Sequence, residues 1–383
     1  MNILVAHGGG PTPVMNSSLR GVIEGARAHG SKGRIYAARF GAEGILKGDL
    51  MDLTDLGEDQ VRRLSQTPAS AIGSCRRKLS EKDYPAVLEC MREHDIQCLL
   101  YNGGNDSMDT CHKLSELAKA SGRELYVMGI PKTIDNDLDV TDHCPGYGSA
   151  ARFAAVAAAE IGADASALPI HVVVMEVMGR NAGWLTAAAS LGSEISGCEM
   201  ITLLPERPLD LKAFLPEVEK RYAGGKGLLV AVSEGVCDLA GNPLADSGIV
   251  DGFGHKVPGG AAQKLSEIIM QELGIKSRSE KPGLLGRACM AYVSERDREE
   301  AYQVGYLAVQ AALQGKSGSM IAMEVSRSPR YHVDYIETPL ALVANKEKKF
   351  PVEWIRGFDI EEGFKEYALP LMGEALPVYT RLR

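Results

Sequence analysis

Short apolar runs alternate with longer stretches of helical periodicity along most of the chain. Short β-branched runs predict buried strands, and apolar residues spaced three and four apart predict helices. The predicted strands cover residues 2–6, 34–40, 97–102, 124–129, 171–177, 199–203, 227–233 and 319–325. The predicted helices begin near residue 14 and cover much of 83–94, 107–120, 148–161, 182–191, 210–222, 258–273 and 298–314. This alternation predicts an α/β fold with doubly wound, Rossmann-like parallel sheets.

The length of 383 residues and the two successive sets of strands predict two domains. We assign residues 1–140 to a first α/β domain and residues 141–325 to a second one. Residues 326–383 carry no motif that we can interpret, and packing back on the first domain is one option for them.

The composition narrows the classes of partner. With 42 basic and 50 acidic side chains the formal net charge is -8, which argues against nucleic acid or an anionic membrane surface as a partner. No apolar run approaches the length that crosses a membrane, and the N-terminal residues lack the pattern of a signal peptide. The eight cysteines are scattered without a C-x-x-C pair, which is typical of reduced thiols in a cytoplasmic protein.

Three polar loops, at residues 8–16, 103–107 and 131–137, each follow a predicted strand. In doubly wound sheets, ligands bind where the loops leave the carboxyl ends of the strands. The first loop, GGGPTPVMN, has glycines that let backbone N–H groups approach a phosphate, but a tight turn is an equal alternative. The second loop, GGNDS, fits either phosphate and metal contacts or the capping of a helix by Asp106 or Ser107.

The third loop, PKTIDND, combines a lysine with two carboxylates two residues apart. Packing does not explain such a cluster, because buried carboxylates are costly without partners. One aspartate can accept a hydroxyl proton, the other can help to hold Mg²⁺, and Lys132 can neutralise phosphate charge. A solvated turn is the alternative interpretation.

Motifs in these loops and further along the chain occur together in one enzyme family. They are GGGPTPVMN at 8–16, GSCR at 73–76, GGNDS at 103–107, PKTIDND at 131–137, MEVMGRNAGWLT at 175–186, LLPE at 203–206, SEG at 233–235 and LLGRA at 284–288. In this order they resemble the phosphofructokinase family over most of the chain, with PKTIDND and VMGR as the specific part. The resemblance implies Mg²⁺-dependent phosphoryl transfer to the 1-hydroxyl of fructose 6-phosphate. It also implies that the first domain binds the phosphoryl donor and the second binds the sugar phosphate.

The resemblance implies a role for each motif residue. The residues that it implies for catalysis are Lys132, Thr133, Asp135 as the general base, and Arg180. Those implied for the sugar phosphate are Thr133, Asp135, His171, Met178, Gly179, Arg180, Glu234, Arg278 and Arg287. Those implied for the donor are Gly10, Arg76, Gly104, Asp106 and Lys132, and those for Mg²⁺ are Asn105 and Asp137. Structural alternatives stay open: surface ion pairs for the arginines, a capping role for Glu234, a core position for Met178 and a buried strand position for His171.

Two residues bear on the identity of the donor. ATP-dependent members of the family have glycine at the position of Asp106, which leaves room for the nucleotide α-phosphate. A carboxylate there fills that volume and repels the phosphate by like charge. Lys132, where ATP users tend to have glycine, can stabilise charge on the transferring or departing phosphate. Both residues match the pyrophosphate-dependent branch, whose reaction is expected to be reversible.

Departures from the family pattern keep other interpretations open. Asn105 stands where most relatives carry a metal-associated aspartate, which shifts metal binding toward Asp137. Leu284 stands where relatives often have Tyr or His. An ATP-dependent kinase of the same fold and a catalytically silent sugar-phosphate-binding homologue are therefore the alternatives. The resemblance also implies a homo-oligomer, a dimer or a tetramer, because His171 falls where the family often has an arginine that reaches into a neighbouring subunit.

Overall fold

The computed structural model describes residues 1–223, 227–250, 256–380 and 382, which form two compact units. Unit 1 consists of Met1–Tyr147 and Arg287–Lys348, and unit 2 consists of Gly148–Gly286 and Lys349–Arg383. The chain therefore crosses between the units three times. Among the described residues, no helix is both long and apolar enough to span a membrane.

Unit 1 contains a seven-stranded sheet in the order β13-β12-β5-β4-β1-β2-β3. Its strands are β1 (Asn2–His7), β2 (Ile35–Ala38), β3 (Leu50–Asp52), β4 (Ile96–Gly103), β5 (Tyr126–Pro131), β12 (Ser319–Ser326) and β13 (His332–Pro339). The five central strands run parallel, whereas β3 and β13 are antiparallel to their neighbours. We predicted a parallel sheet, and the observed sheet is mixed at its two edges. The connections after β2 and β12 are too short for the crossover that joins parallel neighbours, so β3 and β13 pair antiparallel.

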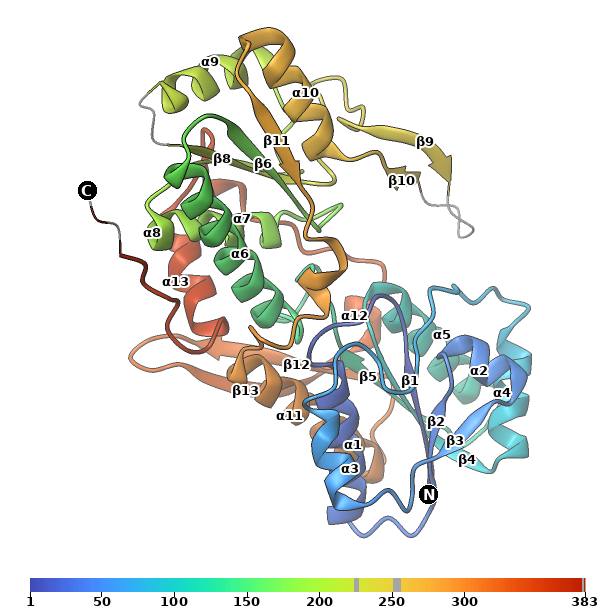
Figure 1. Cartoon of the computed structure of the whole chain (residues 1–383). Coiled ribbons are helices and arrows are strands. Elements are labelled where there is room, and N and C mark those ends of the chain that lie inside the picture. Colours follow the sequence, from blue (N-terminus) through green and yellow to red (C-terminus); the bar gives the residue numbers. More distant parts are fainter. Residues whose placement is uncertain (224–226, 251–255, 381, 383) are drawn as a thin grey trace. The chain divides into compact units, whose positions relative to one another are not determined.

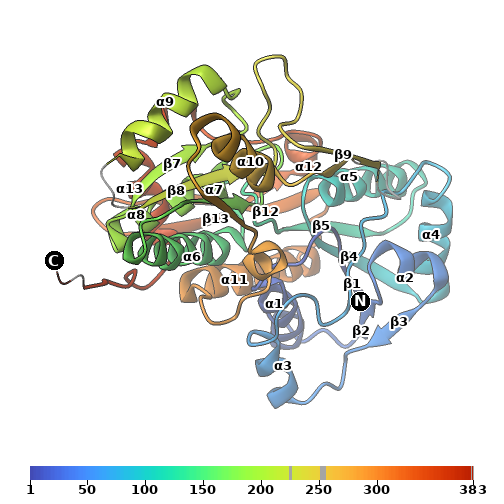
Figure 2. The same ribbon diagram turned by 45° about the horizontal axis from the view of Figure 1, so that its top comes forward.

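Helices cover both faces of this sheet, as Figure 2 shows. They are α1 (Met15–Ala28), α2 (Ala42–Lys47), α3 (Glu58–Leu64), α4 (Tyr84–Glu93), α5 (Asn105–Ala120), α11 (Glu295–Leu313) and α12 (Leu340–Val343). Along β1, Leu4 and Ala6 pack with α2, α4 and α5, whereas Ile3 and Val5 pack with α1, α3 and α11. The alternation of strand side chains thus places a separate hydrophobic core on each face.

Unit 2 contains a parallel four-stranded sheet in the order β11-β6-β8-β7. Its strands are β6 (Val172–Val177), β7 (Glu199–Leu203), β8 (Leu228–Ser233) and β11 (Ser277–Glu280). Two separate two-stranded sheets consist of β9 (Asp246–Val250) with β10 (Lys256–Pro258) and of β14 (Ile355–Arg356) with β15 (Asp359–Ile360). The helices are α6 (Tyr147–Ala167), α7 (Trp184–Ser190), α8 (Gly192–Ser196), α9 (Leu211–Tyr222), α10 (Ala261–Leu273) and α13 (Glu362–Leu371), with 3₁₀ turns at Gly283–Arg287 and Val352–Trp354. One face packs on α9 and α10, and α7 packs on the other (Figure 1).

The two units do not coincide with the predicted segments 1–140, 141–325 and 326–383. The stretch 287–325, which we assigned to the second domain, belongs to unit 1. The reason is α11, whose Val304 and Ala308 are fully buried in the core of the unit 1 sheet. The C-terminal stretch 349–383 belongs to unit 2, where Trp184 and Phe350 form an aromatic pair with ring centroids 5.2 Å apart.

Candidate active site

The first glycine loop joins β1 to α1 in unit 1 and holds a lysine from another strand. The Lys132 ammonium, just after β5, donates a hydrogen bond of 2.6 Å to the Gly10 carbonyl oxygen. The loop is also fixed by Ser74, whose hydroxyl donates to the Gly9 carbonyl oxygen at 2.7 Å. Gly9 has φ 77°, a left-handed conformation that favours glycine.

Two guanidinium groups lie beside the same loop. A Cβ atom built at Gly10 would lie 2.9 Å from a nitrogen of Arg287 and 3.6 Å from a nitrogen of Arg76. A side chain at position 10 would therefore push the Arg287 guanidinium away from the loop, whereas Arg76 would stay at an ordinary contact distance. Together with Lys132, these residues gather three positive charges from distant parts of the sequence around one glycine loop, which is the arrangement that a polyphosphate needs.

The ammonium of Lys132 has an unusual proton affinity. Burial lowers the pKa of Lys132 to about 8, the nearby carboxylates of Asp135 and Asp137 oppose this, and Arg287 and Arg76 reinforce it. An anion bound in the loop would favour the charged form of the lysine. Without an anionic ligand, the site therefore disfavours the charged form of Lys132.

The second loop begins helix α5, with Gly104 immediately before its first residue. The side-chain oxygen Oδ1 of Asn105 is buried and has no hydrogen-bond partner. Asp106 follows in the first turn, and its carboxylate forms an ion pair of 3.0 Å with the Lys78 ammonium. The Asp106 side chain is 68% exposed, so it projects from the helix start into open space.

The third loop follows β5 and carries the two candidate aspartates. The Thr133 hydroxyl accepts a hydrogen bond of 3.0 Å from the Asp135 backbone N–H, which makes a tight turn before the general-base candidate. Burial raises the pKa of Asp137, and a hydrogen bond with Thr133 opposes that shift. A nearby cation would therefore stabilise the charged form of the half-buried Asp137 carboxylate.

In unit 2, the MGR motif follows β6 in a loop that a second loop supports. Gly179 has φ 122°, and its carbonyl oxygen accepts a hydrogen bond of 2.6 Å from the Ser233 hydroxyl. A Cβ atom at Gly235 would lie 1.7 Å from the Arg180 carbonyl oxygen, so this position of the SEG motif requires glycine. The Arg180 side chain is exposed, and Met178 is half-buried.

Glu234 lies at the carboxyl end of β8, beside the MGR loop. Burial raises the pKa of Glu234, the neighbouring Glu176 adds to the shift, and Lys281 and Arg180 oppose it. The Lys281 ammonium forms an ion pair of 2.5 Å with Glu176, whose side chain is almost completely buried. We did not predict a role for Lys281, although it follows β11 as the other site residues follow their strands.

His171 and Arg278 lie at the opposite end of the unit 2 sheet. His171 precedes β6, whereas Met178 and Arg180 follow it, and Arg278 lies opposite Val173 in the parallel register of β11 and β6. At about 3.3 Å per residue, the length of β6 separates the two groups by roughly 20 Å. Burial and the charge of Arg278 lower the pKa of His171, whose Nδ1 is buried without a hydrogen-bond partner.

The predicted residues therefore form three groups. The donor and metal candidates, with Thr133, Asp135 and Arg287, belong to unit 1. In unit 2, Met178, Gly179, Arg180 and Glu234 form a second group, and His171 and Arg278 form a third at the other end of the sheet. A model of the family described as Phosphofructokinase matches residues 2–312. The chain belongs to the phosphofructokinase family.

Relatives of this phosphofructokinase match over nearly its whole length. It is 43% identical to the "Pyrophosphate--fructose 6-phosphate 1-phosphotransferase" of Xanthomonas campestris pv. campestris, over 100% of this chain and 96% of that protein. A solved structure of a pyrophosphate-dependent phosphofructokinase from Nitrosospira multiformis has a TM-score of 0.89 and 38% identity, covering 99% of this chain and 94% of that one. The corresponding structure from Marinobacter aquaeolei has a TM-score of 0.87 and 36% identity, covering 99% and 93%. These matches confirm the predicted family and fold class.

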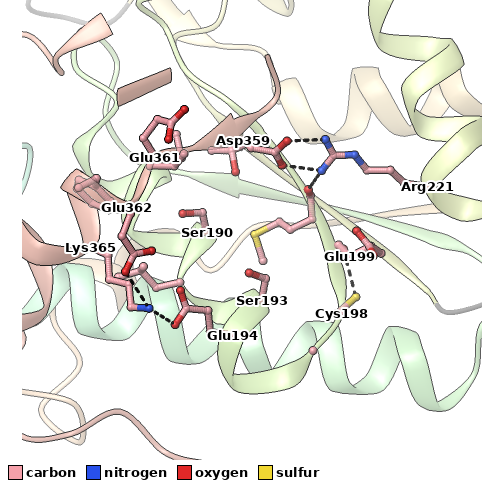
Figure 3. Close-up of a pocket in the computed structure, with 16 residues that line it drawn as sticks. Ser190, Ser193, Glu194, Cys198, Glu199, Arg221, Asp359, Glu361, Glu362 and Lys365 are labelled. Atoms are coloured by element: carbon pink, nitrogen blue, oxygen red, sulfur yellow. Dashed lines mark hydrogen bonds and ion pairs between the residues drawn. The ribbon is translucent and has the colours of Figure 1, made fainter. Parts of the chain in front are cut away.

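A cavity of about 370 Å³ in unit 2 of this phosphofructokinase lies apart from the motif residues. Its lining comes from α7, α8, β7, α9 and the C-terminal stretch, and Figure 3 shows the basic side chains of Arg221 and Lys365 paired with acidic ones. Arg221 binds the Asp359 carboxylate at 2.7 and 2.8 Å, and the Lys365 ammonium lies 2.8 Å from Glu194. Because its cations are already neutralised, this cavity does not have the charge that a phosphate site requires.

Proposed function

We propose that this phosphofructokinase transfers a phosphoryl group from pyrophosphate to the 1-hydroxyl of fructose 6-phosphate. The products are fructose 1,6-bisphosphate and phosphate, and the reaction runs in both directions. The observation that carries the proposal is the cluster of Arg76, Lys132 and Arg287 around Gly10, with Asp106 at the start of the adjoining helix. Relatives 38–43% identical to this chain are named for the same reaction.

The charge of the unit 1 site fits a compact, highly charged donor. Three cations around the glycine loop offset the charge of pyrophosphate, and Lys132 stabilises the charge that develops on the transferring phosphate. Asp106 excludes a nucleotide by occupying the space of its α-phosphate and repelling it. The position of Arg287 beside Gly10 favours a contact with the donor phosphates rather than the 6-phosphate contact expected from the sequence.

The acceptor hydroxyl needs a base, and Asp135 is the group that we assign to this role. Its backbone is fixed by Thr133, so the carboxylate is held on a rigid turn. As the sugar oxygen attacks the donor phosphorus, Asp135 takes the hydroxyl proton, and phosphate leaves in line with the attack. In the reverse direction the protonated Asp135 returns that proton.

Phosphofructokinases generally need a divalent metal ion, and we assign Mg²⁺ to Asn105 and Asp137. The residues fit such an ion, because the Asn105 Oδ1 is a buried oxygen without a hydrogen-bond partner, and burial disfavours the charged form of the Asp137 carboxylate, which raises its pKa. In the part of the chain that the structure describes, no group of three or more His, Cys, Asp or Glu side chains could hold a metal. Mg²⁺ often takes few protein ligands and completes its shell with water and substrate phosphates. When bound, the ion would neutralise charge on the donor oxygens.

The sugar phosphate fits the unit 2 group. Arg180, Met178 and Gly179 would hold the sugar and its charge, and Glu234 would accept hydrogen bonds from sugar hydroxyls. His171 and Arg278, at the far end of the same sheet, would serve the site of a neighbouring subunit in a homodimer or homotetramer. None of the eight cysteines, all of which lie among the described residues, forms a disulfide bond, which supports a cytoplasmic location.

Replacement of Asp135 tests this mechanism. Asp135→Asn should cut kcat by roughly a hundredfold or more, the range of a lost general base, while the KM for fructose 6-phosphate changes little. Steady-state rates with pyrophosphate measure both constants, and Asp139→Asn, four residues along the same stretch, is the matched control. Retained turnover in Asp135→Asn would remove Asp135 from this role.

A further inference from the structure

Asn136, between the two candidate aspartates, has an unusual backbone conformation. Its φ is 55°, in the left-handed region, and its side chain is completely buried. The Asn136 Oδ1 accepts a hydrogen bond of 3.0 Å from the Cys144 backbone N–H. The chain bends at residues 134–135, just before Asn136, and the Asn136 side chain anchors this turn of the backbone between the aspartates to the loop that follows.

Lys348, from the end of unit 1, contacts the same turn from the other side. Its backbone N–H donates to the Asp137 carbonyl oxygen at 2.9 Å. Its ammonium donates to the Asp142 carbonyl oxygen at 2.7 Å and the Thr141 carbonyl oxygen at 3.1 Å, and lies 3.5 Å from the Asn136 Oδ1. The preceding residue, Glu347, forms an antiparallel bridge with Leu138.

The loop that receives these bonds is itself fixed to the rest of unit 1. The Asp142 carboxylate accepts two hydrogen bonds from Arg327, at 2.6 and 2.8 Å, and lies 2.9 Å from the His143 Nδ1. The other ring nitrogen of His143 lies 2.7 Å from a carboxylate oxygen of Glu300 on α11. Lys348 thus bonds the aspartate turn to a loop that strand β12 and helix α11 hold in place.

We propose that Lys348 is a positioning residue that, with Asn136, fixes the Asp135–Asp137 turn for phosphoryl transfer. This inference rests on the proposed function of the two aspartates. The ammonium donates to two carbonyl oxygens of the loop that follows the turn and lies 3.5 Å from the Asn136 Oδ1 within it. Lys348 therefore joins the turn to that loop, and it acts through the aspartates and not on the substrates. Removing it would leave two carbonyl oxygens without their donor and release the restraint on the turn, and a shift of about 1 Å at a catalytic group can cost roughly a hundredfold in rate.

Two variants remove the anchor in different ways. Lys348→Met keeps the length of the side chain without the charge, and Asn136→Gly removes the amide while glycine tolerates the left-handed φ. Each should lower kcat with pyrophosphate roughly tenfold to a hundredfold and raise the Mg²⁺ concentration for half-maximal rate, with the KM for fructose 6-phosphate nearly unchanged. Because both act on one turn, the double variant should lose no more than the worse single variant. Lys346→Met, at an exposed lysine two residues away, is the matched control.

Hydrogen–deuterium exchange provides a readout that does not depend on activity. Peptides covering residues 134–146 should exchange faster in Lys348→Met and Asn136→Gly than in the wild type, whereas Lys346→Met should match the wild type. Unchanged exchange, or a lower melting temperature with wild-type kcat and Mg²⁺ dependence, would overturn the proposal. Absence of pyrophosphate-dependent activity in the wild type would instead remove the proposed function, and the exchange result would still decide whether Lys348 holds the turn.

Discussion

At the scale of single residues, the site depends on side chains whose charge the surrounding protein disfavours. Lys132 is the clearest case, because burial together with two arginines opposes its charge, while the two aspartates favour it. Binding of an anion to such a site is favourable, because the negative charge offsets the repulsion among the cations and stabilises the charged lysine. This is a physical reason for a pyrophosphate site to bury a lysine between arginines.

The pH dependence of catalysis should report this lysine. With the pKa of Lys132 at about 8 in the free enzyme, kcat/KM for pyrophosphate should fall as the pH rises through that value, because the ammonium loses its proton. Lys132→Arg keeps its charge at every accessible pH, so this alkaline decline should disappear even if the overall rate is lower. Initial rates at low pyrophosphate between about pH 6.5 and 9.5 measure the effect. An identical decline in both proteins would assign it to another group.

We propose that donor choice also depends on single residues. The double substitution Asp106→Gly and Lys132→Gly removes the carboxylate to which we assign the exclusion of an α-phosphate and the lysine to which we assign the binding of pyrophosphate. The variant should gain measurable phosphoryl transfer from ATP and lose most of its rate with pyrophosphate. Asp109→Gly with Lys113→Gly removes one acid and one base further along helix α5 and is the control. If the Asp106 and Lys132 variant gains no use of ATP, the steric account of donor choice is wrong.

Sequence reasoning found the residues that lie in contiguous motifs but not those that join them. Lys132, Asp135 and Asp137 occupy one loop, so their spacing alone indicated a site. Lys348 contacts that loop from more than two hundred residues away in the chain and stands in no motif. The position of Arg287 beside Gly10 was also missed, because no local pattern indicates that the chain returns to unit 1 at that residue.

At the scale of elements, hydrophobic periodicity predicted the central strands and long helices well. Strand β7 has the predicted bounds, and β1, β4, β6 and β8 differ from theirs by one or two residues. Strands β3, β11 and β13 of the two larger sheets were missed, as were the short paired strands β9, β10, β14 and β15. The burial pattern of β13 shows the reason: this edge strand alternates exposed and half-buried positions, so it lacks the apolar run that marks a buried strand.

A buried ionic contact joins the loop after the aspartates to helix α11. Burial alone would lower the pKa of His143, but the charges and hydrogen bonds of Glu300 and Asp142 outweigh it and raise the pKa to about 9. A group with a raised folded-state pKa stabilises the fold fully below its unfolded value of 6.5, and this contribution is lost as the pH rises through about 9. The helix and loop are therefore held most firmly at neutral and mildly acidic pH.

The melting temperature of His143→Gln should show this dependence. At about pH 6 the variant should melt several degrees below the wild type, and the difference should narrow by about pH 9.5, where the histidine of the wild type is largely neutral. His332→Gln, at an exposed histidine that contacts Asp334, should follow the wild type at both values. A difference that stays constant with pH would mean that packing, and not the charge of His143, stabilises this contact.

At the scale of the whole molecule, the chain divides its functional groups between two discontinuous units. Each unit is a sheet with helices on its faces, parallel throughout in unit 2 and parallel in its five central strands in unit 1. Motif loops leave the carboxyl ends of parallel strands in both units. The alternation of strands and helices predicted this architecture, but it did not predict that the chain crosses between units at residues 286–287 and 348–349. Those crossings depend on packing between distant segments, such as α1 with α11, which no local pattern records.

The central claim is that pyrophosphate is the phosphoryl donor. The most direct test measures the rate of fructose 1,6-bisphosphate formation from fructose 6-phosphate and Mg²⁺, with pyrophosphate or ATP supplied separately to the same preparation. The account predicts rapid formation with pyrophosphate and none above background with ATP. Formation with ATP alone would contradict the roles given to Asp106 and Lys132, and absence of product with both donors would contradict the proposed activity itself.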